Sequence, residues 1–234
     1  TVFYIDIRTQ SKGYEEFAQQ AMEEYDVLYV RGKASKVFQQ NGHVVVWGVD
    51  TLTGLPIEVE ADLVVLATEG SGNRPDWLHR SDAEAIARGS GAMTLFVPGG
   101  AARGIVSLEN GDLDLKNILV PVDGNLDGAA AIEFARRTAE IIGDGDVVIT
   151  VFHVGLQMPP LPALPEGEGW TWQTSLGQGE PVESILAEAE KLQANLIVMT
   201  TNGRDTLGEA VLGSTTERVL RRAGCPVLAV PGGR

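Results

Sequence analysis

The chain has 234 residues, enough for one large domain or two small ones, and 44% of them are hydrophobic, which permits a packed core. An excess of 32 acidic over 18 basic residues gives a net charge of −14, which disfavours nucleic acid and anionic membrane surfaces as partners. The single cysteine, Cys225, excludes an internal disulfide and a metal site built from cysteines, and the lack of a membrane-length apolar run or a signal peptide predicts a cytoplasmic protein.

The first 66 residues predict a strand, a helix and a β-meander. Val2–Arg8 predicts the strand and Gly13–Tyr25 the helix. Turn signals at 41–42 and 51–54 then separate four short extended segments: Val27–Val30, Lys36–Gln39, Val44–Val49 and Ile57–Glu60.

A duplicated segment follows. Residues 61–100 align with residues 194–233 at a constant offset of 133, and 14 of the 40 positions are identical. Each copy predicts a buried strand, a glycine-containing loop, a helix opened by Ser-x-x-Glu and a second strand that stops at a proline. The four predicted strands are Leu63–Ala67, Met93–Val97, Leu196–Met199 and Pro226–Val230. Each copy is therefore half of a parallel α/β unit.

The second copy is preceded by the remainder of an α/β domain. A glycine-rich stretch, Gly99–Asp114, predicts a linker, and a proline-rich stretch, Met158–Glu168, predicts a loop. The other expected elements are a strand at Asn117–Asp123, a helix at Ala129–Ile142, strands at Val147–Val154 and Trp170–Leu176, and a helix at Val182–Leu192. Right-handed crossovers turn this series into a parallel sheet with helices on both faces.

Residues 115–233 resemble a universal stress protein (UspA-type) domain. The matching strings are NILVPVD at 117–123, LIVMTTNGR at 196–204 and LGSTTERVLRRAGCPVLAVP at 212–231. The resemblance implies a Rossmann-like fold of the adenine nucleotide alpha hydrolase-like kind. The family's nucleotide-binding members carry the pattern G-2x-G-9x-G-(S/T), which falls here on Thr200, Gly203, Gly213 and Ser214, so that Thr200 replaces the first glycine.

This resemblance implies a site for ATP or a related adenine nucleotide, with or without Mg. A phosphate requires backbone N–H donors without obstructing Cβ atoms, and it is favoured by the positive end of a helix. The implied phosphate contacts are Gly203, Gly213, Ser214 and Thr215, with charge from Arg204; Asp123 lies near the nucleoside, and Val154 and Met199 lie around the base. Simpler interpretations stay open, because Ser214 with Glu217 forms a capping box, while Gly203 and Asp123 suit turns.

The N-terminal part of the chain carries two further resemblances to known protein families. Residues 61–105 resemble the end of the first domain in tandem universal stress proteins, but Arg80 replaces the glycine before Ser81, so we expect no nucleotide there. Residues 1–66 resemble the A-type flavoprotein of heterodisulfide reductase, through VFYIDIRTQSKGYEEF (2–17), VRGKASKV (30–37) and DTLTGLPIEVEADLVVLAT (50–68). Without GxGxxG or a cysteine cluster, we expect neither flavin nor an iron–sulfur centre. The expected domains are a degenerate hybrid α/β domain at 1–100, a linker at 101–114 and a complete universal stress protein domain at 115–234.

Three hypotheses about function follow. The first is a nucleotide-binding module in the stress response, with at most slow, incidental ATP hydrolysis, since the sequence offers no catalytic base. The second is an interaction module that binds no nucleotide and forms a homodimer through an apolar edge strand at Pro226–Val230. The third is a remnant of an electron-transfer flavoprotein. His153 and Cys225 are expected to be structural, and no metal site is expected.

Overall fold

The computed structural model describes residues 1–4, 14–40, 43–68, 93–99, 101–107, 112–124, 128–143, 145–201 and 214–232. The chain forms two compact units, Thr1–Asp62 and Leu63–Arg234, each of which has its own sheet.

The first unit is a four-stranded sheet with one described helix. Its elements are β1 (Val2–Tyr4), α1 (Tyr14–Glu24), β2 (Tyr29–Gln40), β3 (His43–Asp50) and β4 (Pro56–Ala61), and the strand order is β1-β2-β3-β4. β1 runs parallel to β2, and β2, β3 and β4 form an antiparallel meander, which confirms the predicted meander. The predicted break between 30 and 36 is wrong, because β2 continues through it with a bulge between Ala34 and Lys36.

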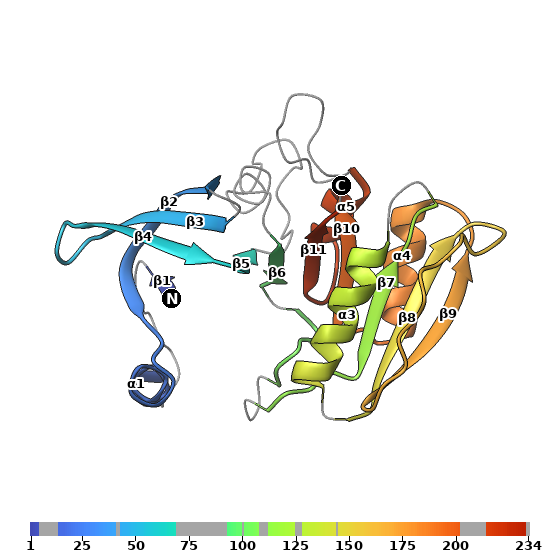
Figure 1. Ribbon diagram of the computed structural model, residues 1–234, viewed down its shortest axis with the longest axis horizontal. Helices are drawn as coiled ribbons and strands as arrows, with labels where there is room; N and C mark the ends of the chain where they lie inside the picture. The colour runs from blue at the N-terminus through green and yellow to red at the C-terminus, as the bar shows by residue number, and fades with distance from the viewer. Residues whose placement is uncertain are drawn as a thin grey trace. The chain divides into compact units, whose positions relative to one another are not determined.

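The second unit is a seven-stranded sheet in the order β5-β6-β11-β10-β7-β8-β9 (Figure 1). Its strands are β5 (Val64–Thr68), β6 (Thr94–Pro98), β7 (Asn117–Pro121), β8 (Val147–Val154), β9 (Trp170–Gly177), β10 (Leu196–Thr201) and β11 (Val227–Pro231). Its helices are α3 (Ala129–Ile142), α4 (Pro181–Lys191) and α5 (Ser214–Leu220). Every pairing is parallel except that between β6 and β11. The predicted α/β fold is confirmed.

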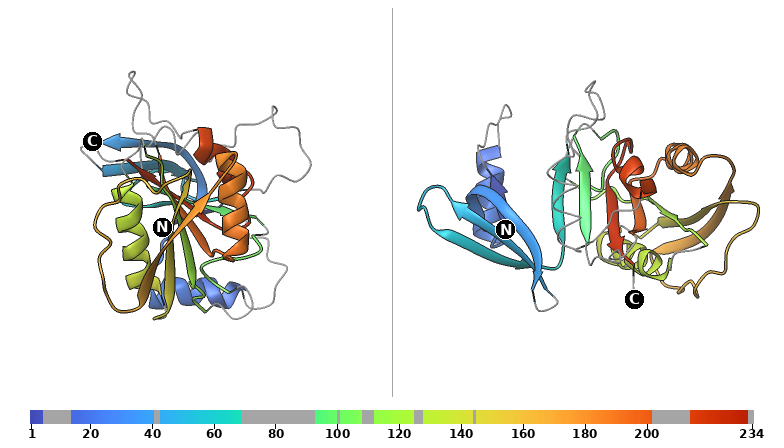
Figure 2. Two further views of the ribbon diagram at one scale, coloured as in Figure 1. Left: turned by 90° about the vertical axis from the view of Figure 1, so that its right-hand side faces the viewer. Right: turned by 90° about the horizontal axis from the view of Figure 1, so that it is seen from above.

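Helices cover both faces of this sheet, as the left view of Figure 2 shows for α3 and α4. On one face α3 packs Ala131, Ile132 and Ala135 into a cluster with alternate strand residues, among them Leu196 and Val198. On the other face α4 and α5 pack into a second cluster, which contains Met199 and Cys225. The sheet is thus buried between two apolar layers, as its nearly continuous hydrophobic strands require.

The two repeat copies have the same strand register. Val64 lies opposite Thr94 in the first copy, and Ile197 lies opposite Val227 in the second, which is the same pair shifted by 133 residues. The copies meet where β6 runs antiparallel to β11, and there Leu95 lies opposite Leu228, its own repeat counterpart. A local twofold axis therefore relates the two copies within one sheet.

This arrangement corrects the expectation of an apolar edge strand at Pro226–Val230. β11 pairs with β10 on one side and with β6 on the other, so it lies inside the sheet. Sequence alone did not place β6 there, because the pairing joins residues more than 130 positions apart.

The expected linker is part of the second unit and forms hydrogen bonds with its other residues. The N–H groups of Ala102 and Arg103 donate to the carbonyl of Gly224, and the Asn195 side-chain amide donates to the carbonyl of Gly104 at 3.1 Å. Arg103 forms an ion pair with Glu190. The described part of residues 101–114 is therefore docked against the sheet. The division into compact units also differs from the expected domains, since β5 and β6 share the sheet of the later elements.

Candidate functional site

The candidate site lies at the carboxyl ends of β7, β8 and β10. The chain runs from β7 outward to β8 and β9, and then returns to place β10 on the other side of β7. Such a point, where successive connections run in opposite directions, leaves a crevice at the carboxyl ends of the strands. Asp123 follows β7, Val154 ends β8 and Thr200 stands near the end of β10, so these predicted residues lie at the same end of three neighbouring strands.

Val154 and Met199 lie on the same face of the sheet. Met199 belongs to the apolar cluster covered by α4 and α5, and Val154 packs against that cluster. Met199 is buried, whereas Val154 is half-buried at the strand end. Both side chains therefore belong to the apolar layer between the sheet and the helices α4 and α5.

Thr200 faces the other way. Side chains alternate along a strand, so Thr200 shares its face with Leu196 and Val198, on the side covered by α3. It is 8% exposed, and its Cγ2 lies 3.3 Å from the place where a Cβ on Gly232 would stand. The methyl group of Thr200 is thus accommodated by the absence of a side chain at Gly232.

Asp123 is exposed at a corner whose backbone is fixed by β8. The N–H of Val122 donates to the carbonyl of Phe152 at 2.8 Å. His153 Nδ1 lies 2.9 Å from the carbonyl oxygen of Val122, and this contact requires the proton on Nδ1. The residue before Asp123 is therefore held from both its amide and its carbonyl.

Two neighbours of this corner were not among the predicted site residues. The ring of His153 fits because residue 155 is glycine, where a Cβ would stand 2.5 Å from His153 Nε2. Pro159, from the proline-rich loop, lies 3.8 Å from the place where a Cβ on Gly124 would stand. The expected structural role of His153 agrees with its backbone contact. Neither neighbour has a sequence signal of its own, since both contacts depend on how β7 and β8 align.

The predicted phosphate side begins at α5, whose first residue is Ser214. Thr215 is half-buried in the first turn of this helix. Gly203, Arg204 and Gly213 lie outside the described residues, as does the side chain of Ser214. Whether Ser214 and Glu217 form the predicted capping box is therefore untested.

Ion pairs connect α5 to α4 behind the site. Arg218 Nη1 lies 2.7 Å from Glu180 Oε1, and Arg222 Nη2 lies 2.8 Å from Glu183 Oε2. Glu180 is also the N-cap of α4, and its carboxylate accepts a hydrogen bond from the N–H of Glu183. This bond and the weaker effect of the bond from Arg218 lower the pKa of the Glu180 carboxyl. The bond from Arg222 lowers the pKa of Glu183 in the same way. These exposed pairs link α5 and the residues that follow it to the first turn of α4.

The described part of the chain shows no metal-binding cluster, no membrane-spanning helix and no exposed cysteine. No cluster of three or more His, Cys, Asp or Glu side chains suited to a metal ion occurs among the residues that the structure describes. None of the helices seen there has the length and hydropathy of a membrane span. Cys225 is buried, and burial raises the pKa of its thiol to about 12, which agrees with the expected role as a small core residue.

Comparison with known proteins finds different similarities for different parts of the chain. Residues 163–231 match the Universal stress protein family. Universal stress protein MJ0531 of Methanocaldococcus jannaschii is 29% identical over 150 residues, which cover 53% of this chain and 86% of that protein. An A-type iron–sulfur component of CoB–CoM heterodisulfide reductase from Methanopyrus kandleri is 42% identical over 65 residues, 27% of this chain. That match spans only 10% of the reductase component.

The fold is shared with solved universal stress proteins. A universal stress protein from Archaeoglobus fulgidus superposes with a TM-score of 0.53 and 20% identity, covering 74% of this chain and 61% of that one. A putative universal stress protein from Pseudomonas aeruginosa gives a TM-score of 0.55 at 15% identity, covering 96% of this chain and 80% of that one. At these identities the likeness concerns the architecture.

Proposed function

We propose that the universal stress protein domain matched at residues 163–231, together with β7 and β8, binds ATP or a related adenine nucleotide. The observation that supports this proposal is that Asp123, Val154 and Met199 stand toward the carboxyl ends of three neighbouring parallel strands. An acid and apolar side chains close to a crossover point suit a nucleoside.

Each residue has a distinct role in this proposal. The carboxylate of Asp123 accepts hydrogen bonds from the ribose hydroxyls, while Val154 and Met199 face the base. Gly203 and Gly213 offer open backbone to the phosphates, with hydroxyl donors at Ser214 and Thr215 and positive charge from Arg204. Mg accompanies the phosphates as their counter-ion. Thr200 contributes its backbone and not its side chain to the nucleotide site, because the side chain points toward Gly232.

The proposal is tested by calorimetric titration of ATP into the whole chain. Asp123→Ala removes charge-assisted hydrogen bonds worth about 1.5–3 kcal/mol, so affinity for ATP falls by roughly 10- to 100-fold. Asp146→Ala is the matched control, because Asp146 is an exposed acid just before β8, at the opposite end of that strand. We expect Asp146→Ala to leave the affinity unchanged. Absence of heat and of any thermal shift with ATP overturns the proposal.

A second candidate function is an interaction module of the same fold that binds no nucleotide. The presence of Thr200 where the nucleotide-binding pattern has glycine favours it. A chain that binds no nucleotide but captures a protein partner would support this alternative. In either case we propose a role in the stress response, in the cytoplasm, where adenine nucleotides are made and consumed. We also propose a homodimer. It does not form through β11 as the sequence predicted, because β11 pairs with a strand on each side.

A further inference from the structure

The side chain of His153 connects the ends of β7 and β8. These strands pair in parallel up to Pro121 and Phe152, and His153 is the next residue of β8. Its ring is half-buried, and its Nδ1 lies 2.9 Å from the carbonyl oxygen of Val122, the residue just after β7. The ring therefore ties β8 to the residue that immediately precedes Asp123.

The glycine at position 155 makes room for this ring. A Cβ on Gly155 would stand 2.5 Å from His153 Nε2 and 2.8 Å from its Cδ2, closer than nonbonded atoms approach each other. The backbone of Gly155 does not lie in the left-handed region that favours glycine. An alanine could adopt this backbone, but it would push the ring away from the Val122 carbonyl. The position of the ring, and not the backbone, thus accounts for the glycine.

A hydrogen bond to the Val122 carbonyl also restrains Asp123. The carbonyl of one residue and the N–H and Cα of the next lie in one rigid plane. The Val122 carbonyl therefore shares a plane with the N and Cα atoms of Asp123. The peptide plane on the other side of Val122 is held by the bond from its N–H to the carbonyl of Phe152, at 2.8 Å. With both planes held, the direction of the Asp123 carboxylate depends on rotation about the bonds of Asp123 itself.

We propose that His153 is a positioning residue of the nucleotide site, which acts through the carbonyl of Val122 to aim the Asp123 carboxylate at the ribose hydroxyls. This inference rests on the function proposed above, because a bound nucleoside is what gives the direction of the carboxylate a consequence. His153 acts without touching the nucleotide. Its side chain lies on the α3 side of the sheet, as does that of Val151, whereas Val154 lies on the side of α4 and α5.

The first test is NMR spectroscopy of the whole chain without nucleotide. With the ring neutral, we expect its proton on Nδ1. His153→Leu removes the donor, so the carbon signal of the Val122 carbonyl and the nitrogen signal of the Asp123 amide should both shift, because a hydrogen bond polarises the peptide group. Gly155→Ala should shift the same two signals by moving the ring. Gly224→Ala is the matched control and should shift neither, because a Cβ there meets nothing within 4 Å and Gly224 precedes β11, at the opposite end of the sheet.

The second test measures the affinity for ATP by calorimetry. His153→Leu should weaken binding by roughly 2- to 10-fold, the range that corresponds to one neutral hydrogen bond, and by less than Asp123→Ala. His153→Asn should restore most of the affinity, because its side-chain N–H group stands as many bonds from the backbone as Nδ1 of histidine. In a chain that already carries Asp123→Ala, His153→Leu should cause no further loss. A residue that only stabilises the fold would not show this dependence on Asp123.

Two results overturn the inference. One is a neutral ring with its proton on Nε2, or Val122 and Asp123 signals that do not change in His153→Leu. The other is a loss of affinity from His153→Leu that is equally large when Asp123 is already alanine. If His153→Leu does not fold, Gly155→Ala replaces it in both tests, because it moves the ring without altering it. If the unaltered chain binds no ATP, the proposed function fails, and the spectra without nucleotide still decide whether His153 restrains Asp123.

Discussion

At the scale of single residues, the orientation of Thr200 decides how its replacement of glycine matters. Its methyl group points toward Gly232, on the face of the sheet opposite Met199. The sequence predicted a substituted glycine, but it could not predict the direction of the side chain. That direction depends on a second glycine, 32 positions later, that β11 brings alongside.

Replacing Thr200 by glycine is therefore expected to change stability more than binding. Glycine in a strand costs about 0.5–1 kcal/mol relative to alanine, and the buried methyl contact is also lost. Urea unfolding measures the loss of stability. Calorimetry should give an ATP affinity within about threefold of that of the unaltered chain, which is a smaller change in binding free energy than the 1.4 kcal/mol that corresponds to tenfold. A tenfold gain in affinity would show instead that the threonine obstructs the ligand.

For the other site residues, too, the sequence predicted positions but not the contacts between distant segments. The acid at 123 and the apolar positions 154 and 199 were implied by the resemblance to universal stress proteins, and they lie toward the same end of β7, β8 and β10. His153 and Pro159 were not predicted as neighbours of the site, because their contacts with Val122 and Gly124 depend on the alignment of β7 with β8 and on the path of the loop.

At the scale of the elements, helices were predicted more accurately than extended segments. α3 spans the expected Ala129–Ile142, because its apolar residues recur with helical spacing. β2 was expected as two pieces, because Arg31–Ser35 is polar and irregular. Pairing with β3 carries the strand across this stretch, and such long-range pairing leaves no periodic signal within β2 itself.

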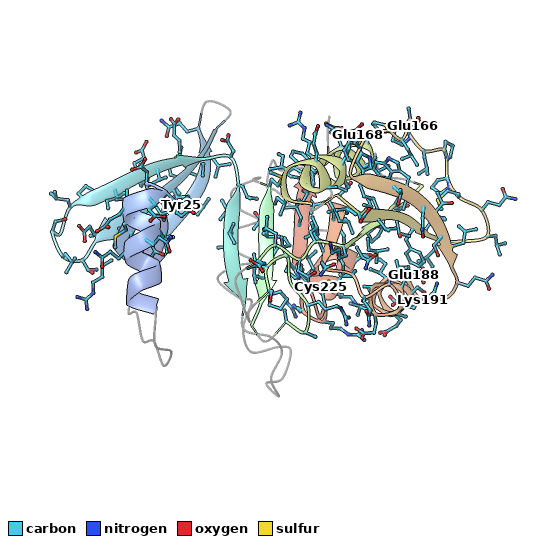
Figure 3. The ribbon with its side chains drawn as sticks, turned by 90° about the horizontal axis from the view of Figure 1, so that it is seen from below. Tyr25, Glu166, Glu168, Glu188, Lys191 and Cys225 are labelled. Carbon is cyan, nitrogen blue, oxygen red and sulfur yellow. The ribbon has the colours of Figure 1, made fainter. Side chains whose placement is uncertain are left out.

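Charged pairs give these helices a pH-dependent contribution to stability. On α3, Arg136 lies 3.0 Å and Arg137 2.9 Å from Glu133 Oε1. The hydrogen bond from Arg136, with that from Arg137, lowers the pKa of Glu133 from 4.5 to about 2. On α4, Lys191 Nζ lies 3.0 Å from Glu188 Oε1. Figure 3 labels both residues.

Because the pKa of Glu133 is lower in the folded chain than in the unfolded one, its contribution is present above about pH 4.5 and is lost as the pH falls toward 2. Glu133→Gln is thus expected to lower the free energy of unfolding at neutral pH by about 0.2–1 kcal/mol, the usual range for an exposed pair. The difference from the unaltered chain should vanish in acid. Glu166→Gln, an exposed loop substitution with the same change of charge, serves as the control. A difference that stays constant with pH would contradict this account.

At the scale of the whole molecule, one buried amide holds the incoming segment onto the sheet. Asn195 is 5% exposed, and its Oδ1 accepts from the N–H groups of Lys116 and Asn117, each at 3.0 Å. Its Nδ2 donates to the carbonyl of Gly104. The glycines of this stretch predicted a linker, whereas its docking was not predicted, since a single Asn carries no pattern.

Asn195→Ala leaves two N–H donors and one carbonyl without their partner. The expected loss is about 2 kcal/mol or more in the free energy of unfolding, because each unsatisfied buried group costs about 1–3 kcal/mol. Asn195→Asp, which introduces the residue found at the equivalent position 62, keeps the acceptor but loses the donor to Gly104. It should be intermediate in urea unfolding. Equal stability of all three chains would show that the segment is held by other contacts.

The antiparallel seam between β6 and β11 has a consequence for how such a chain arises. Two separate molecules that join through these strands must find each other, and their union weakens on dilution. Fusion of the two copies sets the local concentration of one strand around the other through the intervening peptide, on the order of millimolar for short flexible tethers. The seam then survives at any abundance of the protein, and the first copy is free to lose most of its own domain while its last two strands are retained.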